Sequence, residues 1–311
     1  MTLHISNLSK RYANNWVLRD ITIDVEKGKI LGILGGSQTG KSTFLRILAG
    51  KEKPSTELGP FSEFKEIQSI GLDGKQGRLW EFVRKSNHGR VTPHAFRTVL
   101  NSATDVLLID DPLSQMDLQT REELLNELKD KVNEHQLTVI YATADFETAA
   151  LISDEIAVLD STYIQQTGTA EELYESPVST TVARLTGRCN VISARRLTST
   201  RFEVPEFQTI DGGHRLLAEK ADIGKLGAIN RNVSLAIRPE NISMSFGASF
   251  PEDNLIKAVI TGVKYLGPIT LVELDASGLT LTAQVLRLVG LGIGQECMLG
   301  LPPERIKVLK D

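Results

Sequence analysis

The sequence has little cysteine and no long apolar run. Its 311 residues include two cysteines, Cys189 and Cys297, which stand far apart and form no CxxC pair. A disulfide framework or a cysteine-rich zinc site is therefore not expected, and a reducing compartment is favoured. No apolar stretch approaches the roughly 20 residues needed to span a bilayer, and the N-terminus lacks the basic start and apolar run of an export signal. We expect a cytosolic chain that contacts a membrane only through partners.

An excess of positive charge is also missing. The chain has 35 Lys and Arg against 39 Asp and Glu, a formal net charge of -4. Proteins that coat nucleic acid usually carry a basic stripe, so no nucleic acid partner is expected. A content of 41% hydrophobic and 24% charged residues is typical of a globular protein. At about 100–200 residues per domain, the length predicts two domains.

Apolar and amphipathic segments alternate from residue 1 to about residue 185. The apolar runs at 30–34, 106–109 and 138–141 indicate continuous buried strands. Between the last two, residues 121–132 carry apolar side chains at helical spacing with charges between them, which is typical of a helix packed on a sheet. This order predicts an α/β domain with a largely parallel sheet.

After about residue 187 the pattern changes to short alternating strands separated by Gly and Pro turns. Residues 233–237 and 279–285 show the period of two that indicates half-buried strands. We therefore predict two domains, an α/β domain at 1–186 and a smaller all-β domain at 187–311.

A phosphate-binding loop follows the first of these apolar runs. Residues 35–43 fit the pattern GxxxxGK[ST], directly after a predicted strand and directly before a helical pattern. Successive N–H groups of such a loop face the phosphates, Lys41 reaches the β and γ phosphates, and Ser42 ligates Mg²⁺. The predicted nucleotide contacts are Gly35, Gly36, Ser37, Gln38, Thr39, Gly40, Lys41, Ser42 and Thr43.

Two carboxylates end the second apolar run. Asp110 and Asp111 follow a strand-like sequence, as the Mg²⁺-binding acid of P-loop NTPases does. A pair of acids at a strand end is by itself often only a turn or a helix cap, but here it accompanies a complete P-loop. The sequence therefore predicts that ATP and Mg²⁺ bind, with Ser42 and Asp110 as the metal-binding residues.

These motifs resemble those of the ABC ATPases, and the resemblance extends over nearly the whole chain. Tyr12 lies in a segment similar to the family's adenine-stacking loop, which implies contact with the base. Residues 110–117 resemble the Walker B segment running into the D-loop, with Asp117 as its terminal acid. Residues 154–160 and 166–177 are similar to the end of the nucleotide-binding domain in the sugar-importer branch.

The second domain carries the same resemblance. Residues 236–242 and 265–267 look like the C-terminal β-barrel of that branch, an OB-like fold found in ATPases for maltose, glycerol phosphate, polyamines and sulfate. The resemblance implies an import subunit on the cytoplasmic face of the inner membrane. Its partners would be integral membrane permeases, a second ABC ATPase subunit and, indirectly, a solute-binding protein. Sugar or polyol is the solute that the resemblance favours.

The sequence departs from the family at several catalytic positions. The catalytic glutamate is replaced by Asp111, which keeps the charge but is shorter by one methylene, and the switch histidine is replaced by Ala144. Counting back from Asp110 places the signature motif at 86–90, where Asn87 stands for the usual serine. The family's helical subdomain is reduced to about residues 51–95.

The same reduced segment leaves two roles open. Gln76 is a candidate for the Q-loop glutamine, and Gln68 is nearly as good a candidate. The aromatic residues of the segment form either core or a replacement surface for the permease; they are Phe61, Phe64, Trp80 and Phe82.

Three functions remain open from the sequence. The favoured one is an ATP-binding subunit with weak or no hydrolysis that pairs with an intact ATPase, because the residues that hold nucleotide are kept while those acting on the γ-phosphate are not. The second is an active homodimeric importer ATPase with Asp111 as the general base. The third is a soluble ABC protein without a transporter.

Overall fold

The computed structural model describes residues 2–56, 67–70 by backbone alone, 91–103, 105–198, 204–220, 226, 228–247, 254–286 and 290–309. The chain divides into two compact units, Met1–Glu175 and Ser176–Asp311. In the described part of the chain, no helix is both long and apolar enough to cross a bilayer.

The first unit is built on a six-stranded sheet with the order β4-β5-β6-β3-β7-β8. All neighbours in it are parallel except β8, which runs antiparallel to β7. Its strands are β3 (Ile30–Leu34), β4 (Ile67–Ile70), β5 (Val106–Asp110), β6 (Thr138–Thr143), β7 (Glu155–Asp160) and β8 (Tyr163–Gly168). Every residue of β3 and β6 is buried, as is usual for a parallel sheet covered on both faces. The predicted α/β class is confirmed.

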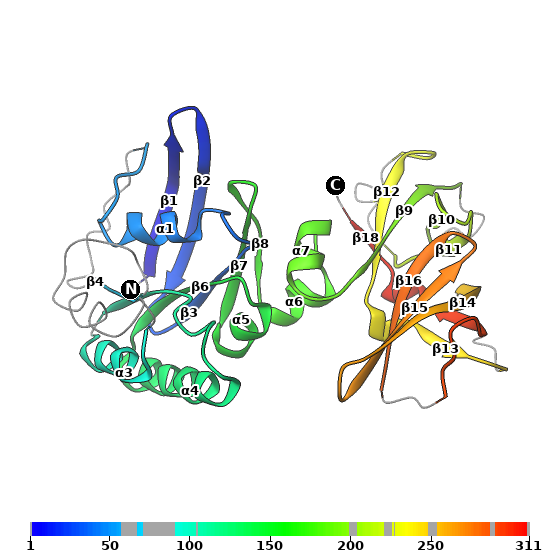
Figure 1. Cartoon of the computed structure of the whole chain (residues 1–311). Coiled ribbons are helices and arrows are strands. Elements are labelled where there is room, and N and C mark those ends of the chain that lie inside the picture. The colour runs from blue at the N-terminus through cyan, green and yellow to red at the C-terminus, as the bar shows by residue number, and fades with distance from the viewer. Residues whose placement is uncertain are drawn as a thin grey trace. The chain divides into compact units, whose positions relative to one another are not determined.

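Different elements cover the two faces of this sheet (Figure 1). One face packs against helix α1 (Lys41–Leu48) and a two-stranded antiparallel sheet of β1 (Thr2–Tyr12) and β2 (Asn15–Glu26). The other packs against helices α3 (Pro93–Ser102) and α4 (Leu118–His135). The apolar residues expected on the helix at 121–132 are buried, and they are Leu124, Leu125, Leu128 and Val132.

Two shorter helices complete the first unit. Helix α5 (Phe146–Ile152) follows β6, and α6 (Ala170–Glu175) follows β8. Because β6 leads into α5 and β3 leads into α1, the loops after both strands lie at the carboxyl edge of the sheet. Ligands of α/β proteins bind at this edge.

The second unit contains two five-stranded sheets, ordered β11-β10-β9-β12-β18 and β13-β17-β14-β15-β16. Apolar residues of both sheets form one core. Both free cysteines lie in this unit, where burial raises the pKa of each thiol. The strands are β9 (Asn190–Arg196), β10 (Glu206–Thr209), β11 (Arg215–Leu217), β12 (Asn232–Ile237), β13 (Ser243–Ser245), β14 (Asn254–Tyr265), β15 (Ile269–Ala276), β16 (Leu279–Leu286), β17 (Glu296–Leu301) and β18 (Lys307–Leu309).

Helix α7 (Thr180–Leu185) belongs to the second unit. Arg238, at the end of β12 and 6% exposed, donates to the backbone oxygen of Ala183 at 2.7 Å and to the Thr186 hydroxyl at 2.8 Å. These bonds attach α7 and its following turn to β12. The division between the compact units after Glu175 therefore precedes the domain boundary that the sequence placed after residue 186.

Candidate nucleotide-binding site

The P-loop connects β3 to α1 and leaves no room for side chains at two of its glycines. A Cβ at Gly35 would lie 2.4 Å from the backbone oxygen of Leu159. One at Gly40, which has a φ of +103°, would lie 2.9 Å from the backbone oxygen of Val17. Only glycine fits both positions, because the backbone must turn tightly between strand and helix. A loop that turns in this way presents N–H groups to an anion at the N-terminus of the helix.

Lys41 folds back into this loop. Its Nζ atom donates to the backbone oxygen of Gly35 at 2.7 Å and of Gly36 at 2.5 Å. Burial lowers the pKa of the ammonium below its usual value, and the charges of Asp110 and Asp111 oppose this shift. The two carboxylates therefore lie close enough for their charges to act on Lys41.

The remaining residues of the loop differ in exposure. Ser37 and Gln38 are exposed, and Ser42 is half-buried at the start of α1. Thr39 donates its hydroxyl to the backbone oxygen of Gly36 at 3.0 Å. Thr43 is buried, and its hydroxyl accepts from Arg46 at 3.0 Å, so this side chain is engaged within α1.

Asp110 and Asp111 stand at the carboxyl end of β5, beside the end of β6. Asp110 pairs with Ala142 in the sheet, and Asp111 donates its N–H to the backbone oxygen of Ala142 at 3.0 Å. Gly35, at the start of the P-loop, donates its N–H to the backbone oxygen of Thr143 at 3.3 Å. The sheet thus brings the P-loop, the two acids and the end of β6 together.

The described residues contain no group of three His, Cys, Asp or Glu side chains placed to hold a metal. Mg²⁺ in nucleotide sites usually takes one or two protein oxygens, with phosphates and water completing its shell. Ser42 and Asp110 are a donor set of this kind.

The carboxylate of Asp111 is engaged by β6 and the residue after it. Burial raises its pKa, while hydrogen bonds from the Thr143 hydroxyl and the Ala144 N–H act in the opposite direction. The Thr143 hydroxyl in turn accepts the N–H of Asp145 at 3.0 Å. The backbone of Asp111 has a φ of +43°, in the left-handed region. The carboxylate of Asp111 is therefore tied to Thr143 at the end of β6 and to Ala144 directly after it.

Arg121 is a residue of this region that the sequence analysis assigned only to the surface helix. Its Nη2 atom donates to the backbone oxygens of Ser114 and Met116, both at 3.3 Å, and Nη1 lies 3.6 Å from the Asp145 carboxylate. Arg121 thus joins the loop after Asp111 to the loop after β6. The sequence feature that could have identified Arg121 is its place as a cation one turn into the helix that Asp117 caps.

Asp117 serves as the N-cap of α4. Its carboxylate accepts the N–H of Thr120 at 2.9 Å, and this bond lowers its pKa. The D-loop role implied for Asp117 stays a prediction.

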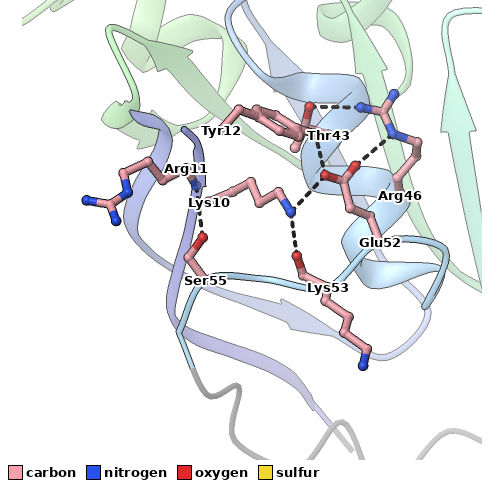
Figure 2. A network of polar contacts seen from close by, with 8 residues as sticks. All are labelled: Lys10, Arg11, Tyr12, Thr43, Arg46, Glu52, Lys53 and Ser55. Carbon is pink, nitrogen blue, oxygen red and sulfur yellow. Dashed lines mark hydrogen bonds and ion pairs between the residues drawn. The ribbon is translucent and has the colours of Figure 1, made fainter. Parts of the chain in front are cut away.

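Tyr12 lies at the end of β1, and its side chain reaches toward α1 (Figure 2). The residue is 43% exposed. Its hydroxyl donates to the carboxylate of Glu52. The predicted base-stacking residue therefore has an exposed ring whose polar end is held in place.

Several expected residues lie outside the described part of the chain. They are Phe61, Phe64, Gln76, Trp80, Phe82 and the signature segment at 86–90, including Asn87. Gln68 lies in β4 and is described by backbone alone.

Comparison with family models matches two separate stretches. Residues 18–91 match the model described as ABC transporter, and residues 235–309 match the model described as TOBE domain. The first match includes the P-loop and ends before β5, so Asp110 and Asp111 lie beyond it.

Curated relatives are similar over most of the chain. The spermidine/putrescine import ATP-binding protein PotA of Acetivibrio thermocellus is 26% identical over 86% of this chain and 85% of its own length. PotA of Rubrobacter xylanophilus is 28% identical over 87% and 82%. The Fe(3+) ions import ATP-binding protein FbpC of Photorhabdus laumondii is 25% identical over 91% and 90%.

A solved structure of an ATP binding subunit of an ABC transporter is 17% identical, with a TM-score of 0.43, and covers 56% of this chain and 92% of that one. This likeness is too low to compare sites.

The family matches agree with the structure of each unit. The P-loop lies between β3 and α1 in the first unit, and the second unit consists of two packed sheets. The chain consists of an ABC-type P-loop ATPase domain followed by an OB-like, all-β TOBE domain.

Proposed function

We propose that this chain is the ATP-binding subunit of an ABC import system and binds MgATP at the P-loop. The P-loop carries the proposal. A Cβ at Gly35 or Gly40 would lie too close to a backbone oxygen, so both positions require glycine, and the Lys41 ammonium lies inside the loop. The curated relatives are named as import ATP-binding proteins. On this basis the chain works at the cytoplasmic face of the membrane, bound to permease subunits.

We further propose that the chain hydrolyses ATP weakly. A general base must reach the attacking water, and a misplacement near 1 Å costs about a hundredfold in rate. Asp111 is shorter than glutamate, and its carboxylate already accepts hydrogen bonds from Thr143 and Ala144. Ala144 supplies no side-chain group to the γ-phosphate. Nucleotide then acts mainly as a ligand that stabilises the closed state of the ATPase dimer. Binding alone stabilises that state by RT ln(1 + [L]/Kd), where [L] is the nucleotide concentration and Kd its dissociation constant.

The partner that fits this division is a second, catalytically intact ATPase subunit. In a homodimer both sites would carry the same substitutions, whereas a heterodimer would divide them between two sites. Pairing with an intact chain is therefore part of the proposal. The named relatives import spermidine/putrescine or Fe(3+), and none of them is named for a sugar. The sugar expectation stays a prediction.

Calorimetry with the full chain tests nucleotide binding. Titration with MgATP should give saturable heat in the wild type and none in Lys41→Ala, which loses the phosphate-binding ammonium. The same two samples are then compared for steady-state phosphate release. An absence of binding in the wild type refutes the proposed function. Rapid turnover that vanishes in Lys41→Ala refutes weak hydrolysis.

Purification of the transporter from membranes through a tag on this chain tests the partner. The expected complex contains permease subunits and a second, different ATPase chain. Two copies of this chain and no other ATPase would contradict the heterodimer.

A further inference from the structure

Glu52 gathers three side chains at the rim of the nucleotide-binding domain (Figure 2). Its carboxylate accepts the Tyr12 hydroxyl, lies 3.0 Å from the Lys10 ammonium and accepts Arg46 Nε at 3.1 Å. The side chain is 17% exposed. Burial acts to raise the pKa of Glu52, but the hydrogen bonds from Tyr12, Lys10 and Arg46 lower it further than burial raises it. Glu52 is therefore an ionised carboxylate bound by three side chains rather than a free surface acid.

The same cluster restricts the ring of Tyr12. The ammonium of Lys10 lies 4.9 Å from the ring centroid, and it also donates to the backbone oxygen of Lys53 at 2.7 Å. A cation in this position is attracted by the face of the ring. One face is therefore occupied, and the hydroxyl at the ring's end is bound by Glu52. The part of the ring that remains exposed is held in one orientation.

The cluster also connects the ring to the helix that begins at the P-loop. Arg46 lies in α1, donates to Thr43 on the same helix and bonds Glu52. Helix α1 starts at Lys41, whose ammonium lies within the P-loop. Because a helix is rigid over so short a length, the position of Tyr12 is set relative to the phosphate-binding end of α1.

We propose that Glu52 is a positioning residue for nucleotide binding, which holds the Tyr12 ring as a preformed platform for the base. This inference rests on the proposed function. Ordering a side chain on binding has an entropic cost, so a ring that is already fixed binds the base more tightly than a mobile one. The positioning acts on the base alone, since the phosphates contact the loop at the other end of the site.

The test compares two ligands that share the triphosphate and differ in the base. Full-length wild type, Glu52→Ala, Tyr12→Phe and Tyr12→Ala are titrated with MgATP and with magnesium tripolyphosphate. Glu122→Gln is the control, because Glu122 is an exposed acid on α4. Tyr12→Phe keeps the ring and the ion pairs of Glu52, so it serves even where Glu52→Ala folds poorly.

Glu52→Ala and Tyr12→Phe should each weaken MgATP binding about threefold to tenfold, the size expected for ordering one side chain. Tripolyphosphate affinity should stay unchanged, and Tyr12→Ala should weaken MgATP binding further. An equal loss for both ligands would show a merely structural role and overturn the inference. A loss of MgATP affinity in Tyr12→Ala alone would also overturn the inference, but it would leave the proposed function standing. A wild type that binds neither ligand refutes the proposed function itself.

Discussion

Lengthening the acid at position 111 should raise the rate of ATP hydrolysis. Asp111→Glu adds one methylene, which moves the carboxylate outward by about 1.5 Å. A displacement of about 1 Å changes the rate of a positioned reaction about a hundredfold, which corresponds to ~2.7 kcal/mol of activation free energy. The longer side chain also takes the carboxylate beyond its present hydrogen bonds from Thr143 and Ala144. We therefore expect Asp111→Glu to increase kcat by about ten- to a hundredfold.

The backbone sets a limit on this gain. Asp111 has a φ of +43°, a conformation that aspartate tolerates better than glutamate does. The variant should therefore unfold at a slightly lower temperature than the wild type. Adding Ala144→His to Asp111→Glu supplies a ring near the γ-phosphate and should raise kcat further.

The assay is steady-state phosphate release at saturating MgATP, with each variant also made in the Lys41→Ala background. Calorimetry confirms that ATP still binds, and circular dichroism confirms the fold. If the folded, ATP-binding double variant hydrolyses no faster than the wild type, positions 111 and 144 do not limit hydrolysis. The reasoning from carboxylate length would then be refuted.

Three further predictions concern residues of both units. Burial lowers the pKa of Lys41, so MgATP affinity should fall as pH rises from neutral toward 10.5. Over the same pH range the free energy of unfolding of the nucleotide-free chain should rise, because the unfolded state binds more protons. Lys41→Arg should remove the loss of affinity measured by calorimetry, and a pH profile that does not change in this variant would contradict the assignment. Gly40→Ala places a Cβ 2.9 Å from the backbone oxygen of Val17 and should abolish MgATP binding in calorimetry while lowering stability by about 1–3 kcal/mol; retained binding would show that the loop turns differently. Arg238→Met removes the guanidinium that donates to the backbone oxygen of Ala183 and to the Thr186 hydroxyl. It should lower the free energy of unfolding by about 2–3 kcal/mol in urea denaturation followed by circular dichroism, whereas a loss below about 0.5 kcal/mol would mean that α7 is held mainly by apolar packing.

Local patterns in the sequence determined the fold class and the phosphate-binding loop. The parallel strands are buried on both faces, so they appear in the sequence as continuous apolar runs. The P-loop is recognised because glycine, lysine and serine stand at the fixed spacing of its motif. The strands and the helix expected at 30–34, 106–109, 138–141 and 121–132 are all present. These features depend on neighbours within a few residues, which is the range over which a sequence pattern carries information.

Tertiary structure alone decided which side chains from distant segments meet. The carboxylate of Asp111 is bound by Thr143 because β5 and β6 pair in the sheet. Tyr12 is bound by Glu52 because the segment after α1 returns to the end of β1. Helix α7 belongs to the second unit because Arg238 attaches it to β12, although its own sequence continues the helical pattern of the first. Such contacts depend on the path of the chain through space, and a single sequence does not encode that path in any local spacing.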